Sequence, residues 1–169
     1  MPVKKILLYP DQRLLKKSTE IEQIDLKVKE IAEDLIDTMY DAEGVGLAAP
    51  QIGINKRIFV MDCNDKQEKR EYIVVINPKV INSSIELKTY KEGCLSIPDI
   101  TEEISRPETV NVSYHDLAGK FKTGKLEGLW ATCFQHELDH LDGKLFIDYL
   151  KPIKRNLIKN KIKKLDKKR

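Results

Sequence analysis

The chain has 169 residues, of which 41% are hydrophobic and 34% charged, and its formal net charge is +3. This balance is ordinary for a soluble folded protein, and the length suffices for one domain whose core needs no disulfides. Three cysteines, an odd number without framework spacing, exclude a disulfide scaffold, so we expect reduced thiols and a cytoplasmic location. The apolar run at residues 6–8 is too short for a signal peptide or a membrane span.

The first predicted element is a helix over residues 25–42, where apolar side chains recur at helical spacing and the pattern ends before Gly44. Short apolar runs then predict a series of strands, with a polar loop at 64–70 between the first two. These predicted strands cover residues 57–63, 72–76, 80–87, 108–115 and 121–126.

A second helix is predicted over residues 128–141, and Gly143 after it is typical of a C-terminal stop. Residues 151–169 are predicted to form a basic C-terminal helix. The order of helix, strands and helix predicts an α+β fold with mainly antiparallel β-sheets around the helix over 128–141. We expect residues 1–169 to form a single catalytic domain without an interior linker.

Residues 136–140 form an H-E-x-x-H motif and supply two of the three histidines of the chain. Histidines four residues apart on a helix project from one face, so both can bind one metal ion. Glu137 between them lies close enough to exchange protons with a water molecule at that ion. The alternative is a chance match on an amphipathic helix, and the motif alone leaves many kinds of metallohydrolase open.

A catalytic site of this kind needs a third protein ligand. The position six residues after His140, where one metalloprotease class has a histidine, is Phe146, and no glutamate follows Glu137. The third ligand is therefore expected upstream, or from an aspartate such as Asp142 or Asp148. Cys94 is a good upstream candidate because a thiolate binds ferrous iron or zinc strongly, although an isolated cysteine is more often a buried hydrophobic residue.

Residues 44–51 form a segment rich in small side chains that ends in Gln51. Its glycines permit a close approach of the backbone to a ligand, and the Gln51 amide could stabilise an oxyanion. Taken alone, the segment would be a helix that ends in glycine, followed by a loop. A phosphate-binding loop is excluded because no Gly-Lys-Ser/Thr sequence is present and the segment follows a helix.

Together these segments resemble the peptide deformylase family. Its motifs G-φ-G-φ-A-A-P-Q, E-G-C-φ-S and Q-H-E-φ-D-H, where φ is apolar, match residues 44–51, 92–96 and 135–140 without a mismatch. The resemblance covers nearly the whole chain and extends to the length and basic C-terminus of the bacterial type 1 class. The chain departs from the family pattern in one place. Some relatives carry an arginine near residues 99–103, but this chain has an acidic stretch there, and the next arginine after it is Arg106.

The resemblance implies hydrolysis of the N-formyl group of nascent methionyl peptides, with release of formate. It implies one divalent metal ion, which is ferrous iron in the cell, with zinc or nickel as substitutes. By the same resemblance, Glu137 transfers protons, and the Gln51 amide and the Leu95 backbone N–H stabilise the oxyanion. The metal ligands that it implies are Cys94, His136 and His140.

The same resemblance implies an apolar pocket for the methionine side chain. The residues expected to contact substrate are Val45, Gly46, Glu92, Gly93, Leu129 and Cys133. For Leu129 and Cys133, core packing on the helix is the alternative. Glu92 could orient a metal ligand or line the pocket, and a surface carboxylate is the competing interpretation.

Two rival functions follow from the same residues. A metallopeptidase that cleaves internal peptide bonds would share the H-E-x-x-H motif. This chain, however, lacks the downstream third ligand that such enzymes use. A ribosome-binding module without catalytic activity is a non-enzymatic alternative, against which the intact Glu137 and Gln51 argue.

Residues 151–169 carry ten Lys/Arg and one Asp, a net charge of +9, whereas the rest of the chain has a net charge of −6. The alternatives for this tail are a solvated helix face and contact with an anionic partner such as the ribosome; we expect neither DNA nor a membrane as a partner. Since every catalytic candidate lies before residue 141, we expect the tail to be dispensable for the chemistry. The apolar side chains expected on one side of the helix are Leu150, Ile153, Leu157, Ile158, Ile162 and Leu165.

Overall fold

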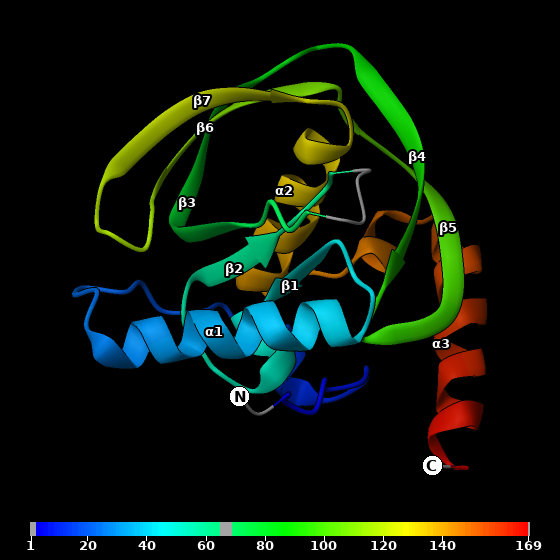
Figure 1. Ribbon diagram of the computed structural model, residues 1–169. Helices are drawn as coiled ribbons and strands as arrows, with labels where there is room; N and C mark the ends of the chain where they lie inside the picture. The colour runs from blue at the N-terminus through cyan, green and yellow to red at the C-terminus, as the bar shows by residue number, and fades with distance from the viewer. Residues whose placement is uncertain (1–2, 65–68, 169) are drawn as a thin grey trace.

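The structure is a computed structural model that describes residues 3–64 and 69–168, with two β-sheets and helices packed around them (Figure 1). Within these ranges, none of the helices is long and apolar enough to cross a membrane. The α-helices are α1 (Leu26–Asp41), α2 (Gly128–Leu141) and α3 (Pro152–Asp166). The short 3₁₀ helices are η1 (Gln12–Leu15), η2 (Ala49–Ile52) and η3 (Phe146–Tyr149).

Both sheets are antiparallel throughout. The larger sheet has five strands in the order β1-β2-β3-β6-β7, and the smaller sheet pairs β4 with β5. This arrangement confirms the predicted α+β fold with mainly antiparallel sheets. The strands of the larger sheet are β1 (Gly46–Ala48), β2 (Ile58–Met61), β3 (Ile73–Ser83), β6 (Thr109–His115) and β7 (Phe121–Glu127). Those of the smaller sheet are β4 (Leu87–Cys94) and β5 (Ile97–Pro107).

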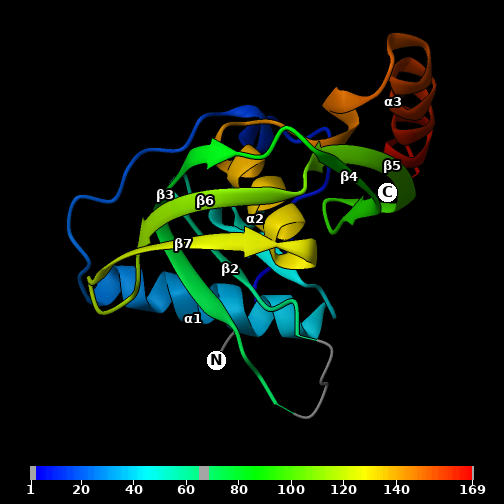
Figure 2. The same ribbon diagram turned by 90° about the horizontal axis from the view of Figure 1, so that it is seen from above.

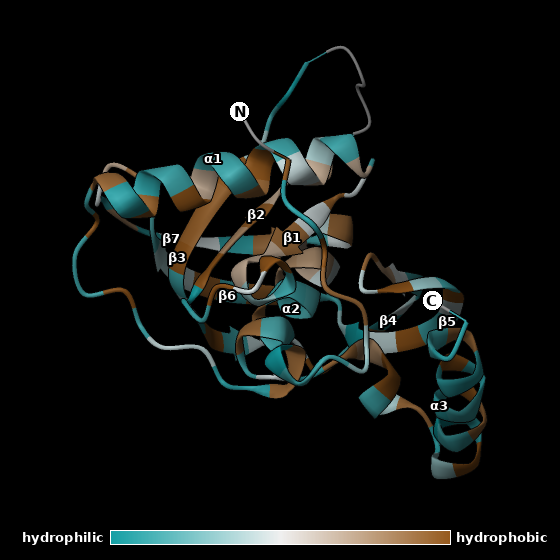
Figure 3. Ribbon diagram, turned by 90° about the horizontal axis from the view of Figure 1, so that it is seen from below, coloured by the Kyte–Doolittle hydropathy of each residue, from teal (hydrophilic) through white to brown (hydrophobic). Residues whose placement is uncertain are grey.

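The larger sheet is covered on both faces, and strand β2 shows why. Successive side chains of a strand point to opposite faces, and all four residues of β2 are buried. Ile58 and Val60 pack in the hydrophobic cluster that contains α1, whereas Phe59 and Met61 pack in the cluster that contains α2. The two helices therefore cover opposite faces of this sheet (Figure 2). Figure 3 shows hydrophobic residues of β2 and β3 beneath α1.

Helix α2 occupies the centre of the molecule because it packs against both sheets, with contacts to β1, β2 and β7 on one side and to β5 on the other. The Schellman arrangement ends the helix: Gly143 N donates to His140 O at 3.1 Å, and Lys144 N donates to Asp139 O at 2.8 Å. The predicted helix over 128–141 and its stop at Gly143 are confirmed.

The strand predictions were correct in part. The strands predicted at 57–63, 108–115 and 121–126 and the helix predicted at 25–42 are present, with ends shifted by one or two residues. The separate strands predicted at 72–76 and 80–87 were wrong, because β3 runs without a break from Ile73 to Ser83, with register shifts after Ile76 and Val80, and Leu87 already belongs to β4. Strands β4 and β5 were largely missed, since most β4 residues are exposed and lack apolar alternation. Residues 65–68 of the predicted loop lie outside the described residues.

Candidate metal centre

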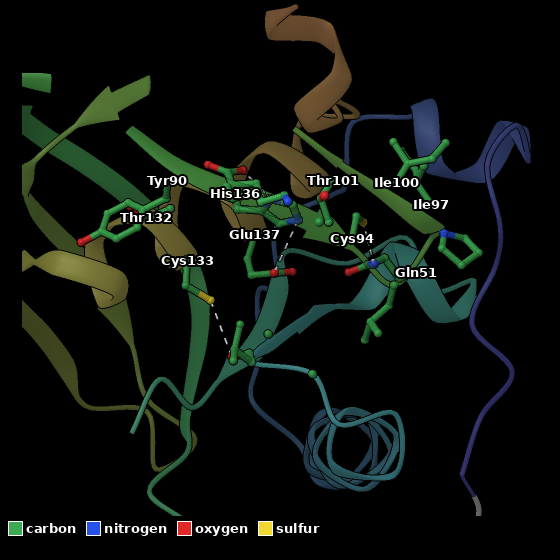
Figure 4. Close-up of a pocket in the computed structure, with 18 of the residues that line it drawn as sticks. Gln51, Tyr90, Cys94, Ile97, Ile100, Thr101, Thr132, Cys133, His136 and Glu137 are labelled. Carbon is green, nitrogen blue, oxygen red and sulfur yellow. Dashed lines mark hydrogen bonds and ion pairs between the residues drawn. The ribbon is translucent and has the colours of Figure 1, made fainter. Parts of the chain in front are cut away.

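Three side chains from two elements converge at the inner side of α2. Helix α2 carries His136 and His140 one turn apart, with their ring centroids 5.0 Å from each other. Cys94, the last residue of β4, places its Sγ 3.3 Å from His140 Nε2. The potential ligand atoms of the three residues all lie within 4.8 Å of one another. The structure thus brings together the Cys-His-His set that the sequence motifs suggested. Figure 4 shows two of the three, Cys94 and His136, with Glu137 and Gln51 beside them.

This donor set fits a divalent ion. Two ligands bound tetrahedrally at ordinary zinc–sulfur and zinc–nitrogen lengths would be roughly 3.5 Å apart, close to the 3.3 Å between Cys94 Sγ and His140 Nε2. Among the described residues, Glu137 Oε1 is buried without a hydrogen-bond partner. Such a buried oxygen is costly unless a bound molecule satisfies it. The centre therefore has the composition and the unsatisfied polar atom expected where a metal ion and a water molecule bind.

The His136 ring is held from behind by a buried ion-pair network. Its Nδ1 donates to Glu92 Oε1 at 3.0 Å, which turns Nε2 toward the cluster. Arg106 donates to both Glu92 oxygens, at 2.7 and 3.0 Å, and to Asp139 Oδ2 at 2.9 Å. Phe146 stacks on the same histidine, with a centroid separation of 6.2 Å and an interplanar angle of 24°. Metal-binding histidines are commonly oriented in this way, because a second hydrogen bond fixes both tautomer and ring direction.

Burial and neighbouring charges shift the pKa values of these groups. Burial raises the pKa of Glu92, but hydrogen bonds from His136 and Arg106 outweigh it and lower the pKa overall. Burial also opposes the charged form of His136, yet its hydrogen bonds to Cys94 and Glu92 raise its pKa well above the ordinary value. For His140, burial and then the charge of His136 lower the pKa well below the ordinary value. The neutral imidazole of His140 is the form that binds a metal.

Glu137 lies beside this cluster on α2, with Oε2 4.0 Å from His136 Nε2. Burial raises its pKa to about 7, whereas the charges of His136 and Arg106 act in the opposite direction. A carboxyl group with a pKa near neutral pH is suited to accept and return a proton. Gly46 makes room for it, because a Cβ at this position would lie 2.6 Å from Glu137 Oε2.

Gln51 enters the site from η2, which follows β1 directly. Its Oε1 accepts a hydrogen bond from Ala48 N at 2.9 Å, and its Nε2 donates to Ser96 Oγ at 3.1 Å. The same nitrogen lies 3.6 Å from Cys94 Sγ. The amide is 2% exposed and held at both ends, so its donor group is fixed next to the metal cluster.

A cavity of about 480 Å³ opens onto the cluster. The site residues that the resemblance implied all line it except His140, which is buried behind the others. The alternative ligands Asp142 and Asp148 do not line it: Asp142 pairs with Arg57, and Asp148 accepts a hydrogen bond from Leu145 N. Cys133 Sγ donates to Val45 O at 3.6 Å within this wall, and a hydrogen bond with Cys63 together with burial raises the pKa of the Cys133 thiol. The sequence candidates in the wall are Val45, Gly46, Gln51, Glu92, Gly93, Cys94, Leu95, Leu129, Cys133, His136 and Glu137.

Sequence reasoning missed much of the opposite wall, which the smaller sheet supplies. Ile97, Ile100 and Thr101 of β5 and Tyr90 of β4 line the cavity. The sequence analysis also assigned no structural role to Arg106, although this residue is 3% exposed and forms ion pairs with two carboxylates, those of Glu92 and Asp139. The buried isoleucines of β5, Ile97, Ile100 and Ile104, lie three and four residues apart, so they do not form the alternation that predicts a strand.

A family model described as polypeptide deformylase matches residues 3–156. A peptide deformylase from Rhizobium meliloti is 48% identical over 158 residues, covering 94% of this chain and 91% of that protein. One from Brucella suis is 45% identical over 165 residues, covering 98% and 94%.

Solved structures of peptide deformylases are similar to this structure over nearly the whole chain. A peptide deformylase from Legionella pneumophila superposes with a TM-score of 0.89 at 44% identity, covering 98% of this chain and 96% of that one. A peptide deformylase from Ehrlichia chaffeensis in complex with actinonin has a TM-score of 0.91 at 39% identity, covering 97% and 98%.

Proposed function

We propose a role for each residue of the site from the premise that this chain belongs to the polypeptide deformylase family. Members of this family are metal-dependent enzymes that remove the N-formyl group from peptides. The observation that carries the proposal is the convergence of Cys94, His136 and His140 beside the Glu137 carboxylate. The rival metallopeptidase function gains no support from these comparisons. We also infer that residues 1–169 act as one catalytic domain, since α2 packs against both sheets.

We propose that Cys94, His136 and His140 bind one divalent ion, which is Fe²⁺ in the cell, with Zn²⁺ or Ni²⁺ as substitutes. A thiolate with two imidazoles suits iron or zinc by its softness. Bound there, such an ion would polarise the formyl carbonyl and lower the pKa of a water molecule. Glu92 keeps the Nε2 of His136 directed at the ion through the hydrogen bond to Nδ1.

Glu137 is proposed to act first as a base and then as an acid. It takes a proton from the attacking water, whose oxygen forms the new bond to the formyl carbon. As the carbon–nitrogen bond breaks, Glu137 returns the proton to the leaving amine, so that formate and a free N-terminus result. The Gln51 Nε2 donor and the Leu95 backbone N–H stabilise the negative charge that develops on the formyl oxygen.

The methionine side chain of the substrate is proposed to enter the apolar part of the cavity. Val45, Leu129 and Cys133 line this region, and the raised pKa of Cys133 keeps its thiol neutral. Gly46 and Gly93 also line the cavity and are proposed to contact the substrate through their backbone groups. Nascent N-formylmethionyl peptides are the proposed substrates. The proposed location is the cytoplasm, where such peptides are synthesised.

Formate release from formyl-Met-Ala, measured with metal content on the same sample, tests this proposal. Glu137→Gln should retain the ion and lose about 10²–10⁴-fold in kcat. Cys94→Ala should lose the ion, whereas the matched variant Cys63→Ala should retain it. Release of formate by Glu137→Gln at the wild-type rate, or metal content that follows Cys63, would contradict the assignment.

We further propose that α3 contacts the ribosome, where the nascent substrates emerge. Three of its apolar side chains remain exposed, Ile153 at 80%, Leu157 at 65% and Leu165 at 36%. Nine of the ten cations at 151–169 lie among the described residues. Such a surface suits an RNA-rich partner. Co-sedimentation with ribosomes should weaken in Ile153→Ser/Leu157→Ser and with added salt; unchanged co-sedimentation of that variant would contradict the contact.

A further inference from the structure

Tyr149 lies at the far end of the network that holds the metal cluster. It is the last residue of η3 and is about half exposed. Its hydroxyl donates to Asp139 Oδ2 at 2.7 Å, and its ring covers the Arg106 guanidinium, whose central carbon lies 4.9 Å from the ring centroid. Tyr149 does not line the cavity, so any influence on the reaction must pass through other residues.

The path from Tyr149 to the cluster is continuous. Asp139 Oδ2 accepts from both Tyr149 and Arg106. Arg106 in turn donates to both oxygens of Glu92, and Glu92 Oε1 accepts from His136 Nδ1. Hydrogen bonds therefore connect the hydroxyl of an exposed side chain to a proposed metal ligand through three charged groups.

The charges in this path are buried and depend on one another. The side chains of Arg106 and Glu92 are 4% and 5% exposed, and that of Asp139 is 15% exposed. Burial lowers the pKa of Arg106, but its bonds to Glu92 and Asp139 outweigh this and raise it. One guanidinium is shared by two carboxylates, so Asp139 relies on the Tyr149 hydroxyl as a second donor. A buried network of this kind is stable only when its members are satisfied.

We propose that Tyr149 is a positioning residue for the metal centre: it fixes Asp139 and shields Arg106, so that the guanidinium holds Glu92 and Glu92 holds His136. Burial and the hydrogen bond to Asp139 raise the pKa of Tyr149 to about 12, so its hydroxyl remains a neutral donor. The inference rests on the proposed metal site and adds η3 to the elements that organise it.

The test measures how fast Co²⁺ leaves the full-length protein for an excess of chelator, followed by the cobalt absorption spectrum. Losing a direct partner of a metal ligand typically costs about 10–100-fold in affinity. Tyr149→Phe, which keeps the ring, should accelerate release by roughly 3- to 10-fold. This is less than the effect of losing a direct partner, because the hydroxyl acts on Glu92 through Asp139 and Arg106, three hydrogen-bonded steps beyond it. Tyr149→Leu, which also removes the ring over Arg106, should accelerate Co²⁺ release more than Tyr149→Phe does and should alter the cobalt spectrum. Tyr72→Phe, a comparably exposed control, should match the wild type.

A double-mutant cycle tests the route. In an Asp139→Asn background, Tyr149→Phe should have little further effect on release, because its acceptor is already changed. Wild-type release rates and spectra in both Tyr149 variants would overturn the inference, as would full additivity with Asp139→Asn. If the wild-type protein itself fails to bind one Co²⁺ per chain, the proposed metal site fails instead, so the two failures are distinguishable.

Discussion

Gly46 is the position where a single added carbon should disturb the catalytic carboxylate. A Cβ there would lie 2.6 Å from Glu137 Oε2 and 2.9 Å from Cys133 Sγ. Gly46→Ala should therefore displace Glu137 and lower kcat by about 10²-fold, because misplacing a reacting group by 1 Å can cost that much. Metal content should remain stoichiometric, since none of the three proposed ligands is touched.

The matched control for Gly46 is Gly124→Ala in β7, where a Cβ meets no atom within 4 Å. It should leave kcat for formyl-Met-Ala unchanged. Equal activities of the two alanine variants would show that Glu137 tolerates displacement.

Gln51 offers a second prediction at the residue scale. Its amide is held by Ala48 and Ser96 beside the cluster, where charge develops only in the transition state. Gln51→Leu should lower kcat by about 10²–10³-fold, the usual effect of losing one oxyanion donor, with little change in KM. Steady-state kinetics would measure this, and a raised KM with kcat intact would assign the amide to substrate positioning.

The residues that the sequence could identify are those whose chemistry is distinctive. Cys94, His136 and His140 belong to types that bind metals, and their motifs place them on recognisable elements. Arg106 and Tyr149 belong to types that are common on surfaces. They acquire a role only because the fold brings β5 and η3 against Asp139, which lies 33 residues from Arg106 and 10 residues from Tyr149.

At the scale of elements, the end of α2 depends on Gly143. Its φ is +75°, and a Cβ would lie 2.6 Å from Leu15 O, a backbone atom that cannot easily move. Gly143→Ala should therefore lower the free energy of unfolding by about 1–3 kcal/mol, from backbone strain in addition to the collision. Urea denaturation of the metal-free protein measures this. Gly124→Ala, without strain, is the control, and equal midpoints would contradict the argument.

Burial explains which elements the sequence could predict. Helix α1 buries one side, so its apolar residues recur at helical spacing, and strands β2 and β6 of the larger sheet pack against helices. Strand β7 is an exception, because it was predicted although none of its residues is buried. Strand β4 has one buried residue, Glu92, and that residue is charged. Its apolar pattern is accordingly absent, although it carries Cys94 and one wall of the cavity.

At the scale of the molecule, α3 is closer to the site than its sequence position suggested. Ile158 and Ile162 are buried in a cluster with Ile97, Ile100 and Ile104 of β5, and Lys154 pairs with Glu102 at 2.7 Å. Figure 1 shows α3 beside β5. Since Ile97 and Ile100 also line the cavity, the packing qualifies the expectation that the tail is dispensable for the chemistry.

Two pairs of substitutions on the same helix separate its inner and outer sides. Ile158→Ala/Ile162→Ala should lower the free energy of unfolding by several kcal/mol, since a buried isoleucine typically costs about 2–5 kcal/mol. By loosening β5 it should also raise KM for formyl-Met-Ala several-fold while kcat changes little, because Glu137 and the two histidines lie on α2, outside the cluster that contains Ile158 and Ile162. Ile153→Ala/Leu157→Ala removes exposed side chains and should shift stability by less than about 1 kcal/mol, with kinetics unchanged. Urea denaturation and steady-state kinetics below the unfolding range measure both effects. If the two pairs behave alike, α3 does not support the cavity wall, and its contribution would be confined to binding partners.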